Sequence, residues 1–96
     1  MDLDALLASL GAAAPPADLA LPLQALWWDR KGDWKKAHEA AQAAPDPEGA
    51  WVHAYLHRVE GDLNNAGYWY RRAGRNAETG PLEAEWRAIA TALLDR

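Results

Sequence analysis

Three histidines are the side chains of this 96-residue sequence whose type and spacing could support metal or acid–base chemistry. His53 and His57 stand four residues apart, so on a helix their imidazoles would share one face and could share a metal ion. Glu60 follows one turn later and could add a carboxylate. The H-E-x-x-H pattern of zinc peptidases is absent, because Ala54 follows His53, and His38 belongs to another predicted helix. The spacing permits a metal site but does not require one.

A second group of residues could bind a polypeptide. Trp51, Tyr55 and Arg58 fall at positions i, i+4 and i+7 and would form one stripe on a helix, offset from the histidines. Aromatic rings provide contact area in protein interfaces, and charged side chains fix the register of the partner. The stripe therefore predicts contact with a peptide or with another helix.

The sequence has few residues that could act as a catalytic nucleophile. The sequence has no cysteine, and Ser9, Thr79 and Thr91 lie far from any histidine. No pair of glycines before a lysine has the spacing of a phosphate-binding loop. We expect a protein that is not an enzyme and that has no cofactor.

Charge and hydropathy argue against nucleic acid and membrane as partners. Arg71, Arg72 and Arg75 adjoin three aromatic residues, but the net charge is −4 and cations commonly end a helix. No apolar run approaches the roughly 18 residues that span a bilayer. The chain opens with Asp2 and Asp4, whereas a secretory signal opens with positive charge. We expect a cytoplasmic protein.

The composition predicts helices throughout. Alanine is abundant, valine and isoleucine are scarce, and phenylalanine is absent. Glycine and proline divide the chain into short pieces, with helices expected over about 3–10, 19 or 22 to 31, 34–44, 47–60, 63–74 and 81–95. Asp46 should cap the fourth helix, with Pro47 in its first turn.

Two Gly-Asp turns recur at an offset of 29 residues. Gly32-Asp33-Trp34 aligns with Gly61-Asp62-Leu63, and each turn combines a glycine that ends one helix with an aspartate that caps the next. Small residues then match at three further places, which are Ala25 with Ala54, Ala37 with Ala66 and Ala44 with Ala73. A helix-turn-helix unit repeated at a fixed period indicates a helical repeat protein.

This pattern of small residue, aromatic, Gly-Asp and alanine resembles the tetratricopeptide repeat, and GDLNNAGYWYRRAG is similar to the related Sel-type repeats. The LWWD, WVHAYLHR and YWYRR segments also resemble those of small bacterial proteins. The resemblance implies an all-α, right-handed superhelix of two units, at about 19–45 and 46–75, within a domain over 18–96. Residues 1–17, a short helix and a linker, and the helix over 81–95 would cap it. The period is shorter than the usual 34 residues, and three units are the usual minimum.

The resemblance also assigns the stripe to a concave groove that binds extended peptides. Its expected lining is Leu26, Asp29, Arg30, Trp51, Tyr55 and Arg58. The chain would then be a non-enzymatic interaction module for a peptide, a partner helix or a second copy of itself. One alternative stays open, because the terminal helix of the chain, or the N-terminal one, could fill the same groove.

The same resemblance changes the interpretation of the histidines. The matching repeat positions normally hold a leucine and a bulky aromatic residue, and the internal alignment pairs His57 with Trp28 and His53 with Gln24. Both histidines are then expected to pack inside a helix pair, with no metal bound. The alternative function is a small-ligand or metal site built from Trp28, His53, His57 and Tyr70.

Overall fold

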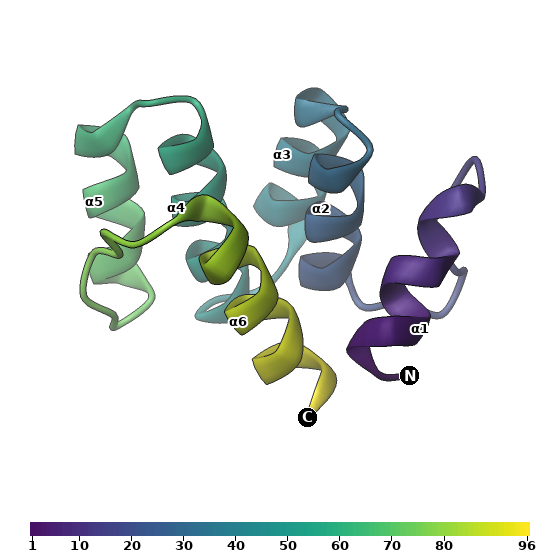
Figure 1. Cartoon of the computed structure of the whole chain (residues 1–96). Coiled ribbons are helices and arrows are strands. Elements are labelled where there is room, and N and C mark those ends of the chain that lie inside the picture. Colours follow the sequence, from purple (N-terminus) through teal and green to yellow (C-terminus); the bar gives the residue numbers. More distant parts are fainter.

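Six α-helices and one short 3₁₀ segment form the chain in the computed structural model, which describes all 96 residues (Figure 1). The helices are α1 (Leu3–Ala8), α2 (Leu21–Arg30), α3 (Trp34–Ala43), α4 (Glu48–Val59), α5 (Leu63–Arg72) and α6 (Leu82–Leu94), with η1 (Ser9–Gly11) directly after α1. The chain has no strand, so the all-α prediction is confirmed. No helix combines the length and the apolar character that crossing a membrane requires.

Both predicted Gly-Asp turns are present, and each joins two helices into a pair, α2 with α3 and α4 with α5. Gly32 and Gly61 have φ values of 83° and 82°, a conformation that glycine adopts without strain. The carboxylates of Asp33 and Asp62 each accept a hydrogen bond from the backbone N–H three residues later, at 3.0 and 3.2 Å. Local sequence signals therefore account for both pairs.

Small residues allow the helices to approach closely. Ala25, Ala37, Ala54 and Ala66, which the internal alignment matched in two pairs, are all buried, with at most 2% of their surface exposed. At the junction of α3 and α4, a Cβ atom on Gly49 would collide with the backbone carbonyl of Ala44. The two helix pairs consequently lie side by side through α3 and α4 (Figure 1).

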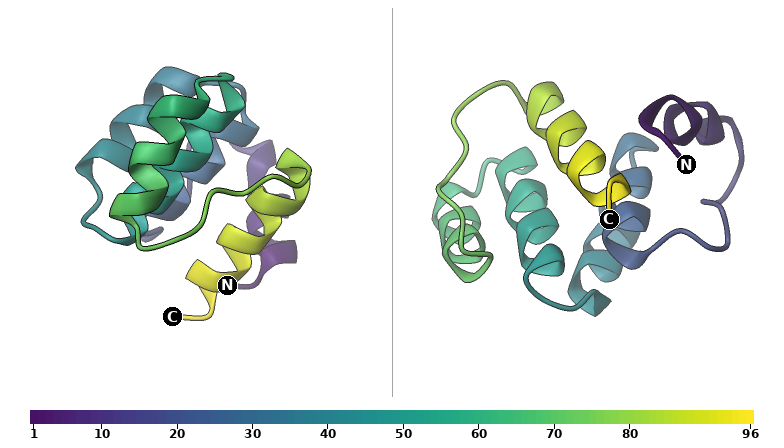
Figure 2. Two further views of the ribbon diagram at one scale, coloured as in Figure 1. Left: turned by 90° about the vertical axis from the view of Figure 1, so that its left-hand side faces the viewer. Right: turned by 90° about the horizontal axis from the view of Figure 1, so that it is seen from below.

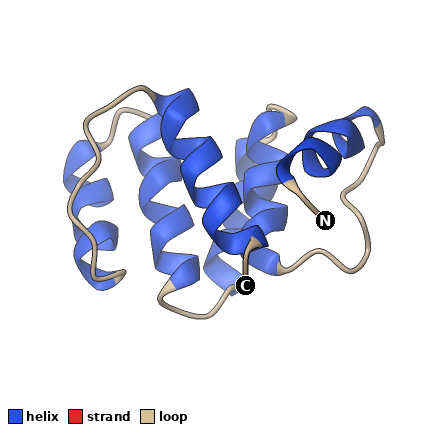
Figure 3. Cartoon of the chain, turned by 60° about the horizontal axis from the view of Figure 1, so that its bottom comes forward, coloured by secondary structure: helices blue, strands red, loops and turns tan.

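Helices from both ends of the chain complete the core. α6 crosses α2 and α4, and α1 packs beside α6, so the two termini lie near each other (Figures 2 and 3). Trp86 and Ile89 of α6 and Leu6 of α1 are buried. The Trp27 indole N–H donates to the Ser9 hydroxyl at 3.0 Å. The segment 1–17 therefore shares its core with the rest of the chain.

The start of α4 differs from the sequence expectation. The helix begins at Glu48 with Pro47 in the capping position, and the Asp46 side chain caps nothing. The Asp46 carboxylate instead accepts a hydrogen bond from Arg72 Nε of α5 at 2.7 Å. The Arg72 guanidinium, a charged donor, therefore occupies the carboxylate that the sequence assigned to the cap of α4.

Candidate metal centre

Three of the predicted groove residues, Leu26, Arg30 and Arg58, contact α6. The Trp86 indole N–H donates to the Leu26 carbonyl at 3.0 Å. The Arg30 guanidinium forms a two-point pair with the Glu83 carboxylate and lies 4.0 Å from the centre of the Trp86 ring. Leu26 and Arg30 of α2 are thus bound by a helix of the same chain.

Buried polar contacts extend this closure. Arg58 Nη1 donates to the buried Glu85 carboxylate of α6 at 2.7 Å, and the Tyr70 hydroxyl donates to the same carboxylate. The Tyr55 hydroxyl donates to Asp29 at 3.3 Å, and burial raises the pKa of both groups.

The remaining groove residue, Trp51, lies under the guanidinium of Arg75, 3.3 Å from the ring centre. The sequence left open whether a partner or the terminal helix fills this face. In the structure α6 covers Leu26, Arg30 and Arg58, and Arg75, in the segment between α5 and α6, covers Trp51.

The three histidines come together on the other side of α4. His53 and His57 are buried on α4, and His38, half-buried, reaches them from α3. His53 Nε2 and His38 Nε2 are 2.8 Å apart, and one ring nitrogen from each of the three residues lies within 4.8 Å of the others. These are all the histidines of the chain, so the fold gathers every imidazole into one cluster.

Two tryptophans hold the imidazole rings in place. The Trp34 ring stacks on His38 with 4.7 Å between ring centres, and the Trp69 ring stacks on His53 with 3.9 Å. The Trp34 indole N–H donates to a backbone carbonyl of α4 at 3.2 Å, which ties α3 to α4 beside the cluster. The ring positions are therefore set by aromatic packing from α3 and α5.

His57 has a ring nitrogen with no hydrogen-bond partner. Its Nδ1 is buried and lies 3.8 Å from the Glu60 carboxylate, which is beyond hydrogen-bonding distance. Histidines that bind a metal commonly direct their second ring nitrogen toward a carboxylate. Glu60 is exposed and has room to move closer to His57. The position of Glu60 beside His57 Nδ1 is thus similar to that of a carboxylate that orients a metal-binding histidine.

Burial and mutual repulsion keep the α4 imidazoles neutral at physiological pH. Burial, followed by the charges of His38 and His57, lowers the pKa of His53 to about 4. Burial and the charge of His38 also lower the pKa of His57. Neutral imidazole is the form that binds a metal ion, so His53 and His57 need release no net proton at pH 7. The hydrogen bond between His53 Nε2 and His38 Nε2 places a proton on one of these nitrogens, and that ring must change tautomer before both nitrogens can bind an ion.

The spacing of the nitrogens fits a transition metal after small side-chain rotations. Zn²⁺ binds histidine nitrogens at about 2.0–2.1 Å in a tetrahedral arrangement, which places ligand atoms roughly 3.3 Å apart. The observed separations, from 2.8 Å to within 4.8 Å, bracket this value. The distances are therefore compatible with one shared ion, and because the His53 and His57 rings stack nearly parallel, 5.0 Å between centres, at least one of these rings must rotate to direct its nitrogen at the ion.

The structure divides the alternative ligand set that the sequence predicted. His53 and His57 are in the cluster, but Tyr70 contacts Glu85 on the α6 side. Trp28 packs against Trp27 with ring centres 4.9 Å apart, away from the cluster.

Sequence reasoning discounted His38 and did not include Trp34 or Trp69. The spacing of Trp34 and His38, four apart on α3, matches that of His53 and His57 on α4 and was the available signal.

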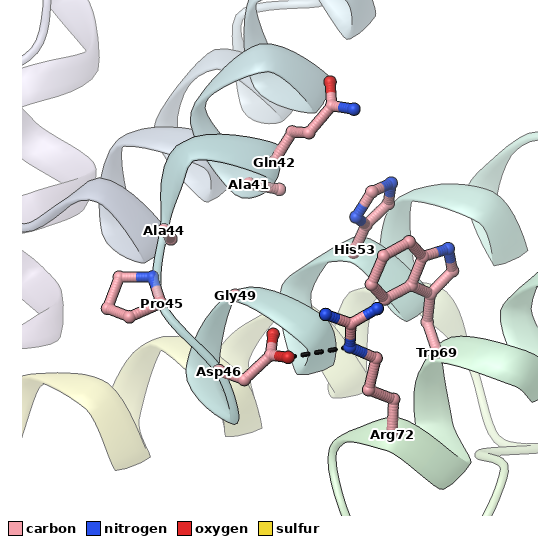
Figure 4. A pocket seen from close by; sticks show the side chains of 9 residues that line it. All are labelled: Ala41, Gln42, Ala44, Pro45, Asp46, Gly49, His53, Trp69 and Arg72. Carbon is pink, nitrogen blue, oxygen red and sulfur yellow. Dashed lines mark hydrogen bonds and ion pairs between the residues drawn. The ribbon is translucent and has the colours of Figure 1, made fainter.

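A cavity of about 250 Å³ adjoins the cluster and includes His53 in its wall (Figure 4). It lies where the end of α3, the start of α4 and the last turn of α5 meet. Its lining residues are Ala41, Gln42, Ala44, Pro45, Asp46, Gly49, His53, Trp69 and Arg72. Small molecules can therefore approach His53 from this side.

Comparisons of the chain with protein-family models, with curated proteins and with solved structures found no match.

Proposed function

We propose that this protein binds a divalent transition metal ion through His38, His53 and His57. The observation that carries the proposal is the convergence of all three imidazoles, from two helices, within 4.8 Å of one another. The burial of His53 and His57 and the stacked tryptophans support it, because ligands held in place lose little freedom when the ion binds.

The donor set indicates which ions the site would accept. Three neutral imidazoles without a thiolate suit Zn²⁺, Cu²⁺, Ni²⁺ and Co²⁺, whereas Mg²⁺ and Ca²⁺ prefer oxygen ligands. Three protein ligands on Zn²⁺ leave a fourth position for water or another molecule. The proposed role is therefore a metal site with one open position.

The interaction role that the sequence suggested would use the face that α6 covers. A partner helix or a second copy could reach Leu26, Tyr55 and Arg58 only if α6 left. That step would expose the buried Trp86 and Ile89 and would separate Arg58 from Glu85. We therefore favour the histidine cluster over this face as the functional site.

Thermal unfolding of tag-free protein with and without Zn²⁺ tests the proposal. An ion present at a hundred times its Kd stabilises the folded state by about 2.7 kcal/mol. For a domain of this length, that corresponds to a rise in Tm of roughly 10–20 °C. The chelator EDTA should return the Tm to its starting value.

Variants separate the cluster from nonspecific binding. His38→Ala removes one proposed ligand at a half-buried position. His57→Leu removes another at a buried position and keeps most of the side-chain volume there. Both should lose most of the shift caused by Zn²⁺. Glu39→Gln changes the exposed neighbour of His38 on α3 and should show the same Tm shift with Zn²⁺ as the wild type. An absent shift in the wild type, or an equal shift in all the variants, would exclude the site.

A further inference from the structure

The cavity beside His53 contains two groups with unused hydrogen-bond donors. Arg72 donates from Nε to Asp46 at 2.7 Å and from Nη1 to the Tyr68 hydroxyl at 3.2 Å, and its Nη2 has no partner in the chain. The exposed Gln42 amide likewise makes no hydrogen bond within the protein. Figure 4 shows the Arg72 guanidinium between Asp46 and the rings of His53 and Trp69. The cavity can therefore donate to a ligand that accepts hydrogen bonds.

The cavity and the histidine cluster meet at His53. His53 belongs to both, and Gln42 follows His38 by four residues on α3, so the two side chains leave the same face of that helix. His53 and Arg72 line the same cavity, and Trp69 contacts both, stacked on His53 at 3.9 Å between ring centres and 5.0 Å from the Arg72 guanidinium. The guanidinium is thus close enough to contact a small ligand that reaches His53.

We propose that the cavity holds a small monocarboxylate that completes the coordination of a metal ion bound by the three histidines. One carboxylate oxygen takes the fourth position on the ion, and the other accepts a hydrogen bond from Arg72. This inference rests on the proposed metal site. Guanidinium groups bind carboxylates with strong, directional hydrogen bonds, and Asp46 already accepts one from Arg72.

The lining of the cavity selects among anions. Asp46 places a negative charge beside Arg72, so a dianion such as hydrogen phosphate is repelled more than an ion with a single charge. Ala41, Ala44 and Gly49 form a small apolar wall that can contact a short aliphatic chain. These features favour a short aliphatic carboxylate over an inorganic oxyanion.

Visible absorption of the Co²⁺-loaded protein tests the inference, because the d–d bands of Co²⁺ respond to a change of ligand. Acetate is titrated into tag-free wild type, Arg72→Met and Arg71→Met at constant ionic strength, with chloride and phosphate as comparison anions. Arg71 is the exposed neighbour on α5 and does not line the cavity, so it provides the matched control. Co²⁺ affinity is measured first for each variant.

We expect acetate to change the Co²⁺ spectrum of the wild type and of Arg71→Met with the same affinity. Arg72→Met should weaken acetate binding about tenfold or more, because a charged hydrogen bond is lost, while Co²⁺ affinity stays within about threefold.

Co²⁺ binding without a response to acetate, or equal acetate affinity in all three proteins, would overturn the inference alone. Tighter binding of phosphate than of acetate would overturn the assignment to carboxylates. A wild type that binds no Co²⁺ would overturn both the inference and the metal site.

Discussion

The replacement Arg58→Met tests the contact that closes α6 over the helix pairs. The Arg58 side chain is 12% exposed and that of Glu85 is 4% exposed, so the ion pair between them is nearly dry. Methionine keeps the length of the side chain but leaves the Glu85 carboxylate with only the Tyr70 hydroxyl as a partner. Breaking one side of a buried pair costs about 3–5 kcal/mol, because the remaining charge stays buried without compensation.

This loss is large for a chain of this size. Domains of about 100 residues are stable by roughly 5–15 kcal/mol, and each kcal/mol shifts the Tm by about 4–8 °C. We therefore expect Arg58→Met to lower the Tm by roughly 12–40 °C, measured by far-ultraviolet circular dichroism with urea unfolding as the second measure. Adding Glu85→Gln should recover much of the loss, because the buried charge is then gone.

Arg87→Met is the matched control for this replacement. Arg87 also pairs with a glutamate on α6, but its side chain is 50% exposed, and exposed pairs contribute about 1 kcal/mol or less. If Arg58→Met costs no more than Arg87→Met, then the buried pair does not hold α6 in place and the reasoning fails.

Three further predictions concern packing, pH and the metal site. Gly49→Ala should destabilise the fold by more than about 2 kcal/mol, because the added Cβ meets the backbone at the end of α3. Gly67→Ala in α5 has space for the added Cβ and should stabilise the fold by about 0.5–1 kcal/mol. If urea unfolding ranks the two variants in the opposite order, the close packing at Gly49 is contradicted. The pKa of His53 is about 4 in the folded chain and 6.5 in the unfolded chain. Between these two pH values the unfolded chain binds a proton at His53 and the folded chain does not, so acid favours unfolding. The free energy of unfolding should therefore fall by up to about 3 kcal/mol between pH 6.5 and 4. In the His53→Gln variant, the urea midpoint should fall less over the same pH range than in the wild type. Glu60→Gln should weaken Zn²⁺ binding by about tenfold to a hundredfold in calorimetry, because it removes the carboxylate that faces His57 Nδ1 and would orient a metal-bound ring. The Tm without Zn²⁺ should stay unchanged, because Glu60 makes no hydrogen bond to His57.

Local signals explain the part of the fold that could be predicted from the sequence. Gly32 and Gly61 adopt the positive φ values that the Gly-Asp turns required, and Asp33 and Asp62 cap the helices that follow. Each signal depends only on residues within one turn of the chain. The helices and their pairing were therefore predictable.

The position of α6 was only partly predictable. Its apolar stripe, which includes Trp86 and Ile89, indicates that one side must be buried, but periodicity does not specify which surface buries it. The choice depends on long-range polar contacts such as the pair between Arg58 and Glu85. Such contacts across 27 residues leave no pattern in a single sequence.

The histidine cluster was missed for a similar reason. The spacing of His53 and His57 was visible, but the approach of His38 depends on how closely α3 packs against α4. Gly49, at the junction, and the stacked Trp34 set that approach. The internal alignment predicted that His53 and His57 pack within one helix pair, whereas the cluster forms between the two pairs.

The central claim is tested most directly by the imidazole nitrogens themselves. Long-range proton–nitrogen NMR spectra of tag-free protein contain signals from only three histidines, because the chain has no others. We predict that one equivalent of Zn²⁺ moves one ring nitrogen of each of His38, His53 and His57 to the shift of a metal-bound imidazole. If any of the three rings keeps its metal-free shifts at saturation, the three-histidine site is contradicted.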